Sequence, residues 1–121
     1  MEENRLLQFF LGLLSQVKLF HWSTMSFAKH KALDELHEAL ASKVDMFVEA
    51  YIGRFKKQPL KSFVIESKVS TDASKLNKFL EAERKKIEDM LDIFAKQPEL
   101  QNILEEMIAE INKTIYLCNL T

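Results

Sequence analysis

One stretch of the chain, residues 26–53, carries side chains that could bind a metal ion: His30, Asp34, Asp45 and Glu49. Apolar residues recur beside them at steps of three and four, which predicts one long amphipathic helix. This predicted core stripe consists of Leu33, Leu36, Leu40, Val44, Phe47 and Tyr51. At about 100° per residue, the four polar side chains fall within an arc of roughly 100° next to that stripe. Imidazole and carboxylate groups suit iron, zinc and manganese, so these four residues are candidate metal ligands.

The spacing of the four residues predicts a site that two chains share. Asp34 and Asp45 lie about 16 Å apart along a helix axis, too far apart to bind one ion. The pair Asp34 and Asp45 and the pair His30 and Glu49 have the same centre, at residues 39–40. If two copies of this helix pack antiparallel about a twofold axis at that centre, the members of each pair lie level across the contact. A closed twofold contact would then form two identical sites per dimer.

Three short motifs in the first half of the chain resemble the ferroxidase signature of the Dps family, the mini-ferritins. They are His21-Trp22, His30-x-x-x-Asp34 and Asp45-x-x-x-Glu49. In that family, two histidines and the first aspartate come from one subunit, and the second aspartate and the glutamate come from its twofold partner. The resemblance therefore implies an iron site at a dimer interface. The implied metal ligands and catalytic residues are His21, His30, Asp34, Asp45 and Glu49.

The resemblance also implies an activity. The protein would be a ferroxidase that oxidises Fe(II) with hydrogen peroxide or dioxygen at a dinuclear site, for iron detoxification and storage under oxidative stress. Zinc or manganese could replace iron on the same ligands, and a larger homo-oligomer could form from the homodimer. The chain departs from the family in three ways: the spacing from His21 to His30 is shorter, Met46 follows Asp45 where an acid is common, and the chain is short. A short, divergent branch, of viral or phage origin for example, would account for these departures.

Composition places further limits on the function. The 121 residues suggest a single ferritin-like domain over residues 1–121. The net charge of −1 provides no general electrostatic attraction to nucleic acid or to an anionic membrane, so we expect neither partner. Residues 9–14 are apolar, but they are too few for a membrane span. The single cysteine, Cys118, cannot form an internal disulfide, which fits a reducing compartment and a cytoplasmic location.

The remaining pattern predicts an all-α fold, a ferritin-like four-helix bundle with a crossover connection between the second and third helices. We expect helices over residues 3–21, 26–53 and 71–96, and a fourth helix that begins at Pro98. Residues 54–70 form the crossover, in which Pro59 prevents a continuous helix.

Several local features accompany this prediction. Ser23 and Thr24 are candidate N-caps of the second helix, and Gly53 is its expected C-terminal cap residue. Some part of the apolar run at residues 63–65 should pack onto the bundle. Trp22 is expected in the core or in an interface.

Two alternatives to the ferroxidase remain open. The chain could be a non-enzymatic dimeric helical bundle whose histidines and carboxylates form salt bridges across the interface. It could also hold a ferritin-type site within one subunit, which would use Glu-x-x-His pairs on two helices. The sequence contains no Glu-x-x-His, and the nearest match is Asp34-x-x-His37, so this second alternative is the weaker one.

Overall fold

The computed structural model describes residues 3–58, 62–65 and 69–120, and within these ranges the chain forms a bundle of helices without a strand. The elements are α1 (Glu3–Ser23), α2 (Phe27–Phe55), the short 3-10 helix η1 (Ala73–Lys75), α3 (Leu76–Ile93) and α4 (Pro98–Cys118). The prediction of an all-helical bundle of four long helices is therefore confirmed. Pro59, which we expected to prevent a helix in the connection, lies outside the described residues.

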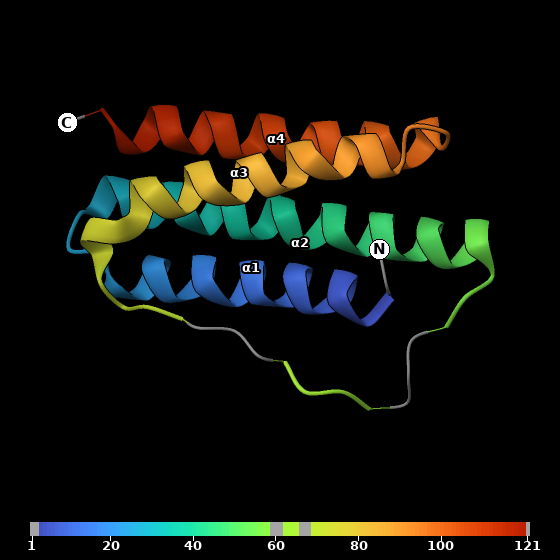
Figure 1. Cartoon of the computed structure of the whole chain (residues 1–121). Helices are drawn as coiled ribbons and strands as arrows, with labels where there is room; N and C mark the ends of the chain where they lie inside the picture. Colours follow the sequence, from blue (N-terminus) through green and yellow to red (C-terminus); the bar gives the residue numbers. More distant parts are fainter. Residues whose placement is uncertain (1–2, 59–61, 66–68, 121) are drawn as a thin grey trace.

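Helix α2 is the central element of the core. It packs against both α1 and α4, and α3 packs against α4 (Figure 1). Every residue of its predicted apolar stripe is buried. An aromatic cluster packs against the C-terminal half of α2: the ring centroids of Phe10 and Phe47 lie 5.3 Å apart, and those of Phe47 and Phe94 lie 5.4 Å apart. The two-sided packing of α2 leaves its third side, which carries the candidate ligands, near the molecular surface.

The start of α2 differs from the prediction. Ser26 is the N-cap, and its hydroxyl accepts a hydrogen bond of 3.2 Å from the backbone N–H of Lys29. Ser23 is still part of α1, and the backbone N–H of Thr24 still donates to the carbonyl of Phe20. Ser23 and Thr24 cannot cap α2 because they complete the last turn of α1.

The end of α2 also differs, because Gly53 does not terminate the helix. The helix continues to Phe55, and Lys56 adopts the left-handed conformation with φ of 54°. The backbone N–H of Lys56 donates to the carbonyl of Ile52 at 2.8 Å, which closes the last turn. Gly53 therefore lies inside α2 with a negative φ.

The two remaining helices agree more closely with the prediction. Asp72 caps η1 by accepting a hydrogen bond from the backbone N–H of Ser74 at 3.1 Å. Helix α3 ends at Ile93, short of the predicted Lys96, and α4 begins at Pro98 as predicted.

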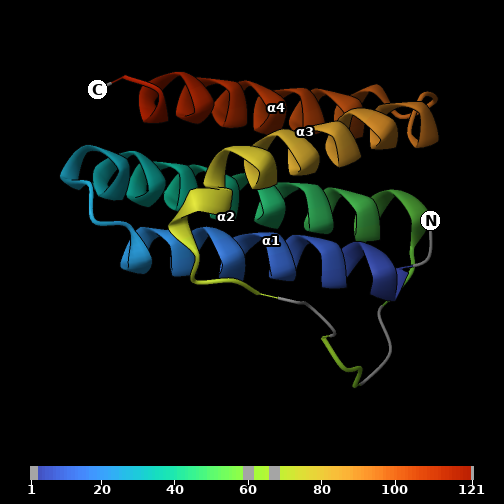
Figure 2. The ribbon, with the colours of Figure 1, turned by 60° about the vertical axis from the view of Figure 1, so that its left-hand side comes forward.

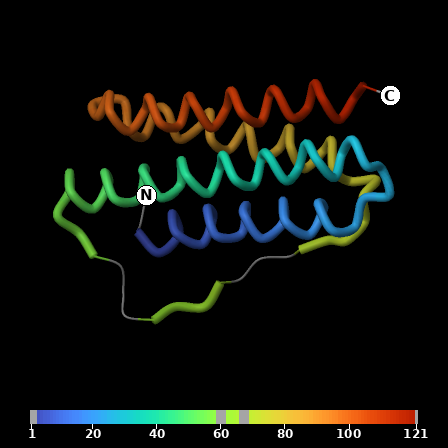
Figure 3. Tube along the Cα trace, turned by 180° about the vertical axis from the view of Figure 1, so that it is seen from behind, coloured from blue at the N-terminus to red at the C-terminus, as the bar shows by residue number. Residues whose placement is uncertain are grey.

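The described parts of the connection between α2 and α3 lie alongside α1 (Figures 1 and 3). The side-chain amide of Gln8 donates to the carbonyl of Val64 at 2.6 Å. The side chain of Gln16 donates to the carbonyl of Ser70 and accepts from its N–H, both at 2.7 Å. The connection thus follows α1 from its N-terminal half towards its C-terminal half, so α3 begins at the end of the bundle where α2 begins. As a result, α2 and α3 run in the same direction, as Figure 2 also shows.

The apolar run at residues 63–65 packs onto the bundle in part, as predicted. Phe63 is half-buried, whereas Val64 is 70% exposed and Ile65 is 48% exposed. The backbone of this segment is fixed by Gln8, so its attachment to α1 does not require that all three apolar side chains be buried.

We predict that Gln16→Ala lowers the free energy of unfolding by about 1–2 kcal/mol, because both amide bonds to Ser70 are lost and Gln16 is buried. Gln8→Ala, which removes one exposed hydrogen bond, should cost less than about 0.5 kcal/mol. Urea denaturation followed by circular dichroism measures both changes. Equal losses for the two variants would contradict the anchoring role of Gln16.

We predict that Gly53→Ala raises the free energy of unfolding of the monomer by about 1 kcal/mol. A Cβ atom added at Gly53 meets nothing within 4 Å, and alanine favours the helical conformation that this position already has. Denaturation of dilute protein measures the effect. A loss of stability would show that position 53 is crowded within a single chain.

Candidate metal centre

His21, in the last turn of α1, and His30, in the first turn of α2, hold each other in place. Nδ1 of His21 lies 2.8 Å from the backbone oxygen of His30, and Nδ1 of His30 lies 2.8 Å from the backbone oxygen of His21. The two rings stack, with centroids 3.9 Å apart and planes inclined by 19°. This reciprocal pair of side-chain-to-backbone bonds, which we call the histidine clasp, ties the end of α1 to the beginning of α2.

The histidine clasp also determines which ring nitrogen is available. A carbonyl oxygen can only accept a hydrogen bond, so each Nδ1 must carry its proton. In a neutral imidazole the other nitrogen, Nε2, then has a free lone pair. The neutral form of each histidine is therefore the tautomer that can bind a metal ion through Nε2. Their backbone acceptors hold the rings as outer partners usually hold metal-binding histidines.

Asp34 lies next to the histidine clasp, one helical turn after His30. Its Oδ1 is 3.9 Å from Nε2 of His21, and its side chain is 62% exposed. The fold therefore brings together His21, His30 and Asp34, the three residues predicted for one half of the site. His21 itself is buried and His30 is half-buried, whereas the carboxylate faces the surface.

Asp45 and Glu49, the residues predicted for the other half, lie farther along α2. Both are exposed, and Asp45 is about 16 Å along the helix from Asp34. Neither carboxylate has an ion-pair partner among the described residues. Within the described part of one chain, no three or more histidine, cysteine, aspartate or glutamate side chains are arranged to hold a metal ion. One chain therefore offers two separate partial ligand sets.

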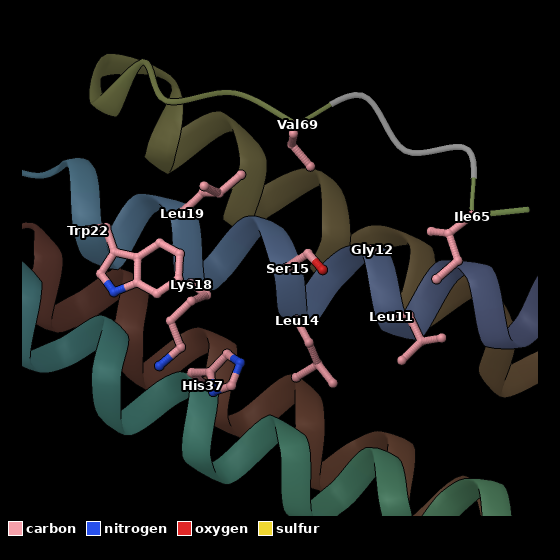
Figure 4. A pocket seen from close by; sticks show the side chains of 10 residues that line it. All are labelled: Leu11, Gly12, Leu14, Ser15, Lys18, Leu19, Trp22, His37, Ile65 and Val69. Atoms are coloured by element: carbon pink, nitrogen blue, oxygen red, sulfur yellow. The ribbon is translucent and has the colours of Figure 1, made fainter.

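A shallow groove runs along the outer face of α1, between α2 and the connection (Figure 4). Its lining is mostly apolar, with two basic groups, and includes Leu11, Leu14, Leu19, Trp22, Lys18 and His37. Burial lowers the pKa of His37, and the nearby charge of Lys18 lowers it further, while Asp34 opposes the shift. The sequence contains a signal for this groove, because α1 carries leucines on its outer side as well as on its core side.

Trp22 is not a core residue, contrary to one of the predicted alternatives. Its side chain is 69% exposed, at the end of the groove. The next residues, which form the turn into α2, expose Met25 and Phe27 as well. Trp22 follows His21 directly, but its side chain lies outside the histidine clasp.

The described residues thus define an all-helical bundle with two histidines and an aspartate gathered at one end. The chain belongs to a family of unknown function (DUF5856), whose sequence profile matches residues 21–118 and so includes all five candidate ligands. It is also similar to an uncharacterized 14.6 kDa protein in the mobD-ri intergenic region of Enterobacteria phage T4. The two are 27% identical over 116 residues, which cover 92% of this chain and 86% of the phage protein. No solved structure matches the chain.

Among the described residues, no helix is both long enough and apolar enough to cross a membrane.

We predict that His37 titrates below its ordinary pKa of 6.5 and that Lys18→Gln raises this pKa. Burial disfavours the charged imidazole, and the substitution removes the repulsion from the lysine. Because the unfolded chain binds this proton more readily than the fold does, His37 makes the protein less stable as the pH falls below about 6.5. NMR titration of the ring C–H signals measures the pKa. A pKa at or above the ordinary value would contradict the burial of this ring.

Proposed function

We propose that this chain is a small ferritin-like protein that binds Fe(II) and oxidises it at sites shared between two copies of the chain. The observation that carries the proposal is the histidine clasp, because it occupies Nδ1 of both imidazoles and leaves Nε2 as the nitrogen that can face a metal ion, with Asp34 beside them. We further propose that the long connection along α1 is the crossover of a ferritin-like bundle, since it lets α2 and α3 run in the same direction.

Each residue has a defined part in the proposed site. His21 and His30 bind iron through Nε2. The Nδ1 protons of both rings are already bonded to carbonyls, so Asp34 is not needed to orient a ring and is free to bind iron itself. Asp45 and Glu49 come from the partner subunit and supply negative charge, which favours Fe(III) over Fe(II). Their lack of cationic partners within the described chain agrees with this role.

The proposed reaction is balanced with iron as the substrate. Two Fe(II) ions each lose one electron, and hydrogen peroxide takes both electrons and two protons to give two molecules of water. Dioxygen can replace peroxide as the acceptor. The same ligands could bind zinc or manganese, and the homodimer could be a building block of a larger assembly that stores the oxidised iron. A cytoplasmic location would fit such a role.

One observation favours a second candidate function, a dimeric bundle without catalysis. Asp34 lies 3.9 Å from His21 Nε2, as an ion-pair partner would if the imidazole were protonated. In this case the carboxylates of Asp45 and Glu49 would pair with histidines across the interface instead of binding iron. The metal content of protein purified from cells supplied with iron distinguishes the two functions.

We predict that two inactive double variants restore Fe(II) oxidation when they are mixed. His30→Ala with Asp34→Ala removes one half of each site, and Asp45→Ala with Glu49→Ala removes the other half. In a heterodimer one site is then intact and the other lacks all four residues, so up to half of the wild-type activity per dimer should return. Oxidation is followed by the absorbance of Fe(III) after the subunits are dissociated and reassembled together.

Each double variant reassembled alone is the control, and circular dichroism establishes that both are folded. Heterodimers that form but stay inactive, beside an active wild type, would contradict the shared site. A wild type that oxidises Fe(II) no faster than buffer would contradict the ferroxidase and favour the dimeric bundle.

A further inference from the structure

The end of α1, the turn and the start of α2 together expose three large apolar side chains at one end of the molecule. Trp22 is 69% exposed, Phe27 is 74% exposed and Met25 is 99% exposed. Single exposed apolar residues are common on protein surfaces, but a group of three within six residues is typical of an interaction site. We call residues 22–27 the apolar tip.

The second feature is Gly53, near the opposite end of α2, for which the structure of a single chain gives no reason. Gly53 lies inside the helix, where glycine is the least favourable residue after proline. Its φ is not positive, and a Cβ atom there would meet nothing within 4 Å. Neither the backbone conformation nor the packing of one chain requires glycine at this position. A close approach by another chain would require it.

The twofold axis predicted from the candidate ligands brings these two features together. That axis crosses α2 at residues 39–40, and Ser26 in the apolar tip and Gly53 are equally distant from it along the chain. In an antiparallel dimer, the apolar tip of one subunit therefore lies level with Gly53 of the partner subunit. Phe27 also precedes Asp45 by five full helical turns, so both side chains point to the same face of α2.

The charges at this contact are complementary as well. Nζ of Lys31 lies 5.8 Å from the centroid of the Phe27 ring, at the edge of the apolar tip. Neither Lys31 nor Glu49 forms an ion pair among the described residues. In the antiparallel dimer, Lys31 and Glu49 of the partner subunit would lie at nearly the same height along the helix pair, because their distances from the twofold axis differ by one residue.

We infer that the apolar tip of one subunit packs on the C-terminal turns of α2 of the partner subunit, in the space that Gly53 leaves open. This inference rests on the twofold axis of the proposed function, which the spacing of the candidate ligands predicts, but it does not require that iron bind. The tip contacts flank the two sites, so they would hold the dimer together before metal binds.

The test measures the dimer dissociation constant by sedimentation equilibrium in the presence of a chelator. Gly53→Gln fills the space with a side chain that favours helix, and Met25→Ser with Phe27→Ser removes apolar surface from the tip. Each should weaken the dimer at least tenfold. The matched controls are Ala82→Gln, on an exposed position of α3, and Val64→Ser, at another exposed apolar side chain, and both should stay within twofold of wild type.

Trp22, the one tryptophan of the chain, provides a second readout. Its fluorescence should shift to the red when the wild-type dimer is diluted, because the exposed indole loses the partner surface. The shift should occur at a higher protein concentration in the Gly53→Gln variant.

A dimer of unchanged affinity in both tip and Gly53 variants would overturn the inference. In that case Fe(II) oxidation by the wild type and the mixing of double variants would still decide the proposed function. Tip variants that lose binding to phosphatidylserine vesicles, but not dimerisation, would also overturn it and assign the tip to a lipid surface. A wild type that is monomeric at every concentration would overturn the inference together with the shared site, even if iron binds.

Discussion

Two imidazoles that bond to each other's backbone carbonyl are the constraint on which the candidate centre depends. The histidine clasp joins the last turn of α1 to the first turn of α2, and it does so with the Nδ1 atoms. The same two bonds position the rings, set their tautomer and leave Nε2 for a ligand. A purely structural contact would gain nothing from this last property, whereas a metal site needs it. The short turn between the antiparallel helices is what allows each ring to reach the other backbone.

Helix α2 has two functions in this arrangement because its polar and apolar residues follow two different stripes. The apolar stripe is buried against α1 and α4 and fixes the orientation of the helix. The polar stripe then lies at the surface. One of its ends carries His30 and Asp34, and the other carries the carboxylates Asp45 and Glu49. A helix is rigid, so these two groups cannot approach each other within one chain. The proposed antiparallel dimer would bring the unlike ends together.

The proposed iron site and the proposed tip contact share one twofold axis and the carboxylate of Glu49, but they rely on different interactions. The iron site depends on ligand chemistry between the histidine end of one α2 and the carboxylates Asp45 and Glu49 of the other. The tip contact depends on apolar burial and on the absence of a side chain at Gly53, at the ends of the pair. A dimer held by its ends could keep the exposed ligand groups facing each other in the absence of metal, which would pre-organise the site.

The sequence by itself determined the four long helices, the buried stripe of α2 and the spacing of the candidate ligands, because helical periodicity acts over many residues at once. It did not determine the helix ends. Three residues between 23 and 26 could each cap α2, and the choice of Ser26 depended on how far α1 continues. Only the tertiary structure decided the exposure of Trp22 and the histidine clasp. The acceptors of that clasp are backbone carbonyls, which every residue has, so no pattern of side chains in the sequence could reveal it.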